Sequence, residues 1–305
     1  MNIDWEAMHE YRGPKLAVVK NGESRLRRLY AHHASRNKSL AIGNMQTEFG
    51  VEVGGRRFPS VEQAYIAGCY SRPTEGHARI QERIRRESDG LRAKAHWRKA
   101  EGAREKKLSA ARRAEYARAV ASIRRDWCEP WHYEFMLWLW WEKMRQNPKF
   151  AARIRSIPLS WDIVEKPPHP NEPDWGALEV MEEVPARGSK SKGRKRRQGT
   201  GVWVGKNHFG VIAMECRDAI RKGRAPDIDI AELNRRRIHF FGKRLTFAKP
   251  EPIAWKPIRR LLYPEAVARQ TEHCRQAGRS RSAAKVAASR ANGRRHVARP
   301  STRGR

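Results

Sequence analysis

The sequence has few cysteines, little acid for its size and no long apolar run. Its 305 residues include four cysteines that lie far apart, with no C-x-x-C pair. This pattern argues against a zinc ribbon or a disulfide framework and is typical of a reducing compartment. No histidines form an H-E-x-x-H arrangement, and we expect neither a metal site nor a cofactor.

Membrane segments are also lacking. The most apolar stretch, residues 135–141, is far too short to span a bilayer. The N-terminal residues carry early acids and no long apolar region, unlike a signal peptide. The sequence therefore predicts a cytoplasmic protein without a membrane partner.

Positive charge is abundant. Lysine and arginine number 65 against 33 acidic residues, which gives a formal net charge of +32. Basic side chains that contact phosphates gain free energy by releasing counterions, so this excess favours nucleic acid as a partner. The alternative is an arginine-rich composition with no specific partner.

Two segments concentrate this charge. Residues 187–197 carry seven basic residues, and residues 275–305 carry ten, both without an acid. Glycine and serine dominate the rest of 186–200, so we expect a mobile basic loop there and a disordered basic tail at 275–305. The nucleic-acid-binding candidates are Arg194, Lys195, Arg196, Arg197, Arg294 and Arg295.

The first half of the chain carries clear local signals. Residues 51–58 alternate apolar side chains around two glycines, which predicts a hairpin. Ser60 and Gln63 form an S-x-x-Q capping box that opens a helix. Residues 76–125 are dense in charge and alanine and predict solvated helices with a break near 89–90.

The most apolar helix is expected at 127–146, where aromatic residues recur at helical spacing. Such a stripe is more often core than a cradle for a ligand. Asn147 is then expected to cap a second helix, with Pro148 at its first position.

Four sequence blocks occur in one order over roughly 175 residues. The first is GN at 43–44 with GGRRFPSVEQAYIA at 54–67, and the second is DW at 126–127 with KMRQNP at 143–148. The third is DIVEKPPHPNEPDWG at 162–176, and the fourth is GKNHFGVIAMECR at 205–217. Together they resemble the NADAR (YbiA-like) N-glycosidase family.

The resemblance covers about residues 40–220. It implies a mostly helical α+β fold, a single YbiA-like domain with small β elements, and a ligand of the ADP-ribose or phosphoribosyl type. Outside that domain we expect a basic N-terminal extension at 1–39, a C-terminal extension at 221–274 and the basic tail.

Members of the family cleave the bond between a ribose C1′ and a base-like nitrogen. A nearby carboxylate can stabilise the developing oxocarbenium charge or activate water, and an acid can protonate the leaving nitrogen. Glu62 matches the glutamate of the family's helix and is our first catalytic candidate. Its alternative role is to complement the helix dipole.

The second carboxylate is less well defined. The family places an aspartate three residues before a Trp-Gly pair, where this chain has Glu172, while Asp174 directly precedes Trp175. Either acid fits the role. Neighbouring prolines stiffen the loop, which suits a site that holds one geometry.

Several residues are candidates for holding the ligand. Trp127 and Trp175 offer indole faces for stacking, or else pack in the core. The turn around Asn207 can present backbone N–H groups to a phosphate, or simply begin a helix. The ligand-binding candidates are Asn44, Trp127, Trp175, Gly205, Asn207, Gly210 and Arg217, the last of which could equally form a structural ion pair.

One departure from the family bears on catalysis. Family members commonly have a lysine seven residues after the helix glutamate, where this chain has Cys69. A thiol cannot replace an ammonium group directly, and we expect Cys69 to be a small buried residue.

The leading hypothesis is therefore an N-glycosidase acting on ADP-ribosylated guanine in nucleic acid or on a related phosphoribosyl-amine nucleotide. The alternative is a catalytically impaired ADP-ribose- or NAD-binding module on a basic nucleic-acid-binding protein. A third hypothesis makes the domain only a scaffold for nucleic-acid binding. Retained carboxylates favour the enzyme, and the missing lysine favours the module.

Overall fold

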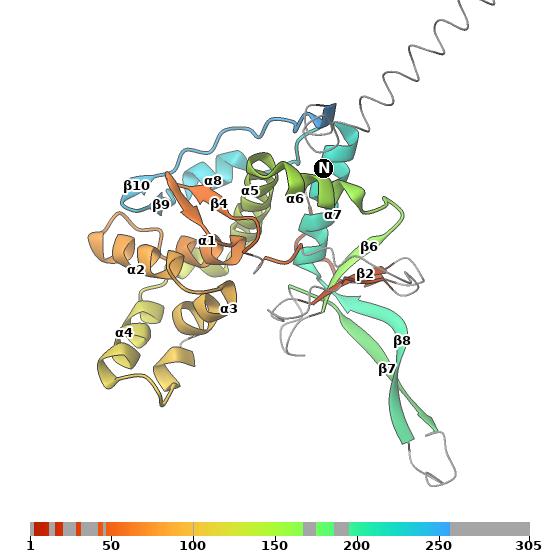
Figure 1. Cartoon of the computed structure of the whole chain (residues 1–305), viewed down its shortest axis with the longest axis horizontal. Helices are drawn as coiled ribbons and strands as arrows, with labels where there is room; N and C mark the ends of the chain where they lie inside the picture. Colours follow the sequence, from red (N-terminus) through yellow and green to blue (C-terminus); the bar gives the residue numbers. More distant parts are fainter. Residues whose placement is uncertain are drawn as a thin grey trace, which may run out of the picture. The chain divides into compact units, whose positions relative to one another are not determined.

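The computed structural model describes residues 3–11, 16–20, 29–31, 42–44, 47–99, 101–166, 175–185 and 195–256. The described residues up to Ile253 belong to one compact unit. The expected mostly helical α+β fold is confirmed, with helices dominant and strands in small sheets (Figure 1). The predicted basic tail lies outside the described residues.

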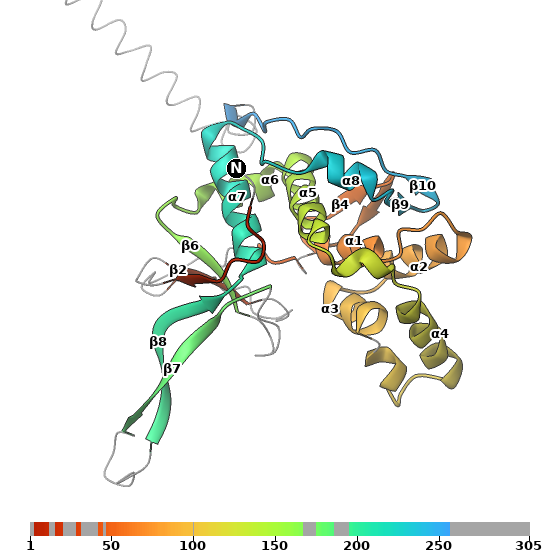
Figure 2. The same cartoon turned by 180° about the vertical axis from the view of Figure 1, so that it is seen from behind.

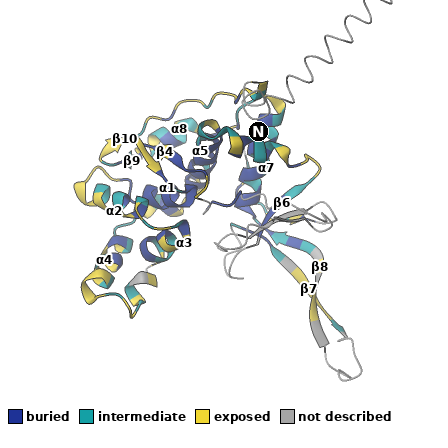
Figure 3. Ribbon diagram, in the orientation of Figure 1, coloured by how far each residue is buried: buried dark blue, intermediate teal, exposed yellow. Residues whose placement is uncertain are grey.

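The helices gather around two that are buried along nearly their whole length. Figure 3 shows α1 and α5 almost continuously buried, whereas α2 and α4 each have an exposed face. The helices are α1 (Val61–Gly68), α2 (Glu75–Arg85), α3 (Gly90–Ala93), the π-helix η1 (Lys94–Arg98), the 3-10 turns η2 (Glu101–Arg104) and η3 (Arg125–Cys128), α4 (Ala110–Ala121), α5 (Trp131–Gln146), α6 (Pro148–Ser156), α7 (His208–Lys222) and α8 (Ile230–Arg235).

The strands form two three-stranded sheets and two hairpins within the described residues. The sheet β1-β8-β7 is antiparallel, and β7 and β8 pair as a long ribbon (Figures 1 and 2). In the sheet β3-β2-β6, β2 and β6 run parallel. The strands are β1 (His9–Tyr11), β2 (Leu16–Lys20), β3 (Leu29–Ala31), β4 (Val51–Val53), β5 (Arg56–Phe58), β6 (Asp162–Lys166), β7 (Leu178–Pro185), β8 (Lys195–Gly205), β9 (His239–Phe240) and β10 (Lys243–Arg244).

The predicted hairpin and the predicted start of the first helix are confirmed. β4 and β5 form the predicted hairpin, and the Ser60 hydroxyl accepts a hydrogen bond of 3.2 Å from the Gln63 N–H at the start of α1. The Gln63 side chain departs from a capping box, because it donates to the carbonyls of Ile84 and Glu87 instead. Gln63 thus ties the first turn of α1 to the end of α2.

Three expectations from the sequence need correction. Residues 195–200 are not a loop but part of β8, because residues 195–199 pair with residues 181–185 of the antiparallel strand β7. The most apolar helix begins at Trp131, and residues 125–128 form a separate turn before it. The charged stretch 76–125 is not simply solvated, since it buries Trp97 and Tyr116 completely or nearly so.

The segments on either side of 40–220 contribute to the same packed unit. Trp5 packs on Tyr133 of α5, with 5.4 Å between ring centroids, and β1 pairs with β8. Phe240 and Phe247 are buried against Phe135. Across the described ranges, every helix is too short or too polar to cross a membrane; the cytoplasmic location stays a prediction.

Candidate functional site

Six rings from separate parts of the chain, including that of Tyr65 of α1, pack together. The Tyr65 ring centroid lies 5.0 Å from that of Trp127 and 5.5 Å from that of Trp175. Its hydroxyl oxygen is 2.8 Å from His132 Nδ1. We call Tyr65, Trp127, His132, Tyr133, Trp175 and His208 the aromatic cluster. It brings together residues from all four sequence blocks.

The two tryptophan candidates differ in exposure. Trp127 is 3% exposed and packs edge-on against Trp131 and Phe135, so its faces are taken up by the core. Trp175 is only partly buried, although its ring contacts Tyr65 and Tyr133. Trp175 is therefore the tryptophan of the cluster that can offer surface to a ligand.

The first catalytic candidate lies beside this cluster. Glu62 is 6% exposed in the first turn of α1, and Tyr65 follows one helical turn later on the same face. The Glu62 N–H donates a hydrogen bond of 3.0 Å to the Asn44 carbonyl. The Asn44 side-chain oxygen in turn accepts a 2.5 Å bond from Trp140 Nε1. Two predicted site residues are thus brought together, with Asn44 holding the backbone of Glu62.

Arg98 is a site residue that sequence reasoning missed. Its guanidinium carbon lies 5.2 Å from the Tyr65 ring centroid, a distance typical of a cation–π contact. Burial by itself would lower the pKa of Arg98, but its neighbours Tyr65, Cys69 and Glu62 together raise it. The arginine therefore stays charged. It places a cation near Cys69, the position at which members of the resembled family commonly have a lysine.

Burial holds three ionisable groups of this site neutral. Burial raises the pKa of Tyr65, and burial raises the pKa of the Cys69 thiol to about 12. Burial, followed by the charges of Arg98 and His208, lowers the pKa of His132 to about 3. At pH 7 the tyrosine, the thiol and this imidazole are all uncharged. The prediction that Cys69 is a small buried residue is confirmed.

Asn207 is a structural residue of the junction between β8 and α7. It has a left-handed backbone (φ 50°) and is fully buried. Its side-chain N–H donates to the Ile163 carbonyl at 2.8 Å, and its side-chain oxygen accepts from the Glu165 N–H at 3.0 Å. The Asn207 side chain therefore ties the start of α7 to β6.

Two glycines of the same junction are required by close packing. A Cβ added to Gly205 would lie 2.4 Å from the Gly176 carbonyl oxygen, and one added to Gly210 would lie 2.0 Å from the Ile163 carbonyl oxygen. Neither neighbour is a flexible side-chain end, so a larger residue would displace backbone. The junction positions His208 in the aromatic cluster, and contact with a phosphate stays a prediction.

The third block supplies a carboxylate that the sequence did not single out. Glu165 of β6 is 4% exposed, and its backbone N–H is held by Asn207. Its carbonyl accepts from the Ala177 N–H at 2.9 Å, two residues after Trp175. Glu172 and Asp174, the predicted second carboxylates, lie outside the described residues.

Arg217 forms a structural ion pair, the alternative to its predicted role in ligand binding. It is 3% exposed and donates to the carbonyl oxygens of Pro158 (3.0 Å) and Trp161, and to Asp218 at 2.8 Å. Its donors are thereby committed to the end of α6 and the start of β6.

The predicted basic residues are only partly described. Arg197 is exposed on β8, and the pairing places Glu183 of β7 opposite it, an arrangement that favours opposite charges. Lys195 and Arg196 are on the same strand. Arg194, Arg294 and Arg295 lie outside the described residues.

Comparison with known proteins gives one distant likeness. No family model matches the chain, and no curated protein matches it. The chain is similar to the NMR structure of the E. coli protein YbiA, with 18% sequence identity and a TM-score of 0.35, over 69% of this chain and 90% of that chain. A TM-score of this size is too low to carry the family assignment, which stays a prediction.

Proposed function

We propose that this chain is an N-glycosidase that hydrolyses the ribose C1′–N bond of ADP-ribosylated guanine in nucleic acid, or of a related phosphoribosyl-amine nucleotide. The observation that carries the proposal is the burial of Glu62, whose backbone N–H bonds to the Asn44 carbonyl and which lies one helical turn before Tyr65 of the aromatic cluster. Trp175 is the surface on which the base or ribose would rest.

The neutral thiol favours direct hydrolysis over covalent capture of an opened ribose. In such a step the oxygen of water bonds to C1′ as the C1′–N bond breaks, and the nitrogen leaves with the bond's electron pair and takes up a proton. Glu62 would accept the proton of the attacking water and stabilise positive charge on the ribose. Arg98 would place positive charge near Glu62 and would attract the phosphates of the ligand.

A direct test is to incubate the full chain with an oligonucleotide ADP-ribosylated on guanine and to follow free ADP-ribose by mass spectrometry. The unmodified oligonucleotide is the control. Release of ADP-ribose together with an intact, unmodified guanine supports hydrolysis at C1′, whereas cleavage of the phosphate chain or no release contradicts the proposal.

The second candidate is a catalytically impaired ADP-ribose- or NAD-binding module. Cys69 favours it, because a buried thiol with a pKa of about 12 supplies neither positive charge nor a nucleophile at neutral pH. Calorimetric titration with ADP-ribose discriminates between the two functions. Binding without turnover of any ribosylated guanine or phosphoribosyl-amine would establish the module.

Arg98→Gln is expected to lower turnover by about 10- to 150-fold, since it removes one charge-assisted contact worth roughly 1.5–3 kcal/mol. Arg98→Lys should retain more activity, because it keeps the charge near Tyr65. Initial rates with the modified oligonucleotide measure both variants. Equal rates for Gln, Lys and wild type would remove Arg98 from the site.

Glu172→Gln and Asp174→Asn are expected to differ at least about tenfold in turnover, because a single acid/base group contributes far more than a bystander. Glu165→Gln is the third member of the comparison, since Glu165 is the buried carboxylate of the same block. Thermal melting shows whether each variant is folded. Equal, small effects from all three would argue for the binding module.

A further inference from the structure

An arginine-lined pocket of about 690 Å³ opens beside the segment that carries Trp127. Its walls contain six arginines and a single acid, Asp126. They come from the segment after α1, from the segment around η3, and from the residues after α8. We call the side chains of Arg72, Arg124, Arg125, Arg236, Arg237 and Arg244 the arginine pocket.

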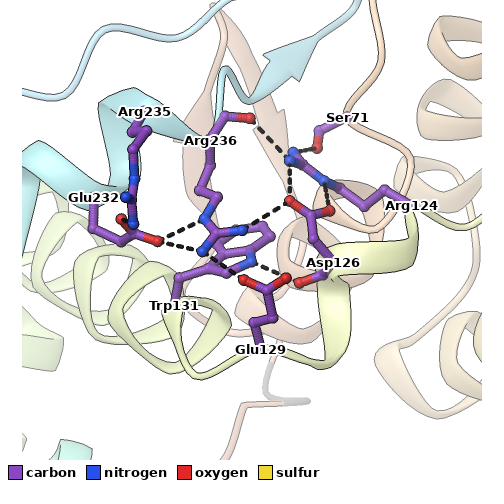
Figure 4. A network of polar contacts seen from close by, with 8 residues as sticks. All are labelled: Ser71, Arg124, Asp126, Glu129, Trp131, Glu232, Arg235 and Arg236. Carbon is purple, nitrogen blue, oxygen red and sulfur yellow. Dashed lines mark hydrogen bonds and ion pairs between the residues drawn. The ribbon is translucent and has the colours of Figure 1, made fainter.

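Two of these arginines are neutralised and form a fixed wall. Arg124 makes two hydrogen bonds to Asp126, of 2.6 and 2.7 Å, and Arg236 pairs with Glu129 and Glu232 at 2.5 Å (Figure 4). Both guanidinium groups lie over the Trp131 ring, at 4.8 and 5.6 Å from its centroid. The acids of this network are therefore already matched by positive charge.

The other four arginines are exposed and carry charge that no acid matches. In the described part of the chain, no carboxylate pairs with Arg72, Arg125, Arg237 or Arg244, although Arg244 donates to the Asn234 carbonyl at 3.0 Å. Four like charges around one opening repel one another in solution. Such an arrangement is relieved by an anion with several charges.

A second arginine-lined hollow provides the contrast. Its arginines, at the surface of α2 and β5, each contact an acid: Arg56 and Arg86 share Glu82, and Arg79 pairs with Glu75. Of these two hollows, the arginine pocket is the one in which arginines have no carboxylate partner.

We propose that the arginine pocket binds the phosphodiester backbone of a nucleic acid. One phosphate engages one or two guanidinium groups, whereas four unmatched groups from three chain segments fit successive phosphates of a polymer. The pocket also adjoins the candidate site. The Arg124 N–H donates to the Cys69 carbonyl at 3.1 Å, and Asp126 is followed by Trp127 of the aromatic cluster.

The test uses the full chain with Arg72→Gln and Arg125→Gln combined, since neither side chain makes a contact that the fold needs. A fluorescent single-stranded oligonucleotide is titrated by anisotropy at several salt concentrations. The slope of log K against log salt should flatten by about 0.7 for each phosphate that is no longer bound, and binding should weaken about tenfold at moderate salt. Combined Arg72→Lys and Arg125→Lys should retain most of the slope.

The matched control combines Arg92→Gln and Arg118→Gln, two exposed arginines outside the pocket. It makes the same change in net charge. Equal slopes for the pocket and control variants would overturn the proposal. A competition with free pyrophosphate completes the test. If the pocket variant kept the wild-type salt slope but its bound oligonucleotide were no longer displaced by pyrophosphate, the pocket would bind small anions and the proposal would be overturned. Turnover of a small ribosyl substrate is measured separately, so that the absence of hydrolysis leaves this result intact.

Discussion

Replacing Glu62 by glutamine is expected to lower the turnover of an ADP-ribosylated oligonucleotide by about 10²–10⁴-fold, the usual contribution of a general acid or base. The amide has nearly the same shape as the carboxylate but can neither take a proton from water nor stabilise an oxocarbenium ion. The hydrogen bond between Glu62 and Asn44 is made by backbone atoms and survives the change. Initial rates of ADP-ribose release measure the effect.

A matched control is Glu52→Gln, the same change at an exposed position of β4. It should leave turnover at the wild-type level. The affinity for ADP-ribose of the Glu62→Gln variant separates chemistry from binding, and it should change by less than the rate. Wild-type turnover in the Glu62→Gln variant would remove Glu62 from its assigned role.

Lys143→Met is expected to raise the free energy of unfolding at pH 7 by up to about 4–5 kcal/mol. Burial, assisted by the charge of Arg153, lowers the pKa of Lys143 from 10.5 to about 7, and a depression of about 3.5 units corresponds to this energy. The nearby ring of Phe150, 4.2 Å from Nζ, compensates the ammonium group only in part. Methionine fills similar space without charge.

The pH dependence identifies the cause. Between pH 7 and 10.5 the unfolded chain holds a proton on Lys143 that the native chain lacks. The free energy of unfolding of the wild type should therefore rise by about 1.4 kcal/mol per pH unit in this range. The difference in this free energy between Lys143→Met and the wild type is therefore largest below pH 7 and becomes smaller above it. Urea unfolding at pH 7, 8 and 9 measures it, with exposed Lys243→Met as the control. A difference independent of pH would contradict this cause.

Local features of the fold could be predicted from the sequence because they depend on neighbouring residues. The hairpin of β4 and β5 follows from alternation around two glycines, and the start of α1 follows from Ser60 and Gln63. The position of Glu62 on that helix comes with them. The sequence could also show that blocks far apart belong together, and the aromatic cluster is the place where they meet.

The roles that depend on tertiary contacts could not be predicted. The turn around Asn207 was expected for its backbone N–H groups, and nothing in the sequence indicates that its side-chain amide bonds to β6, a strand more than 40 residues earlier. Arg98 lies in a stretch whose charge indicates exposure, and burial of the adjacent Trp97 brings it inward. A tryptophan within a basic, alanine-rich segment was the one available sign.

The π-helix η1 makes the position of Arg98 tolerant of a change of one residue in the length of the chain. The Lys99 N–H donates to the Lys94 carbonyl at 3.1 Å, five residues back, so this turn contains a residue more than an α-helical turn does. Deleting Ala95 would restore the ordinary period and leave the Arg98 side chain on nearly the same face, because three α-helical steps of about 100° turn through nearly the same angle as four steps of the wider turn. A gene that lost this one codon would encode all of the same site residues and would keep the cation in its place.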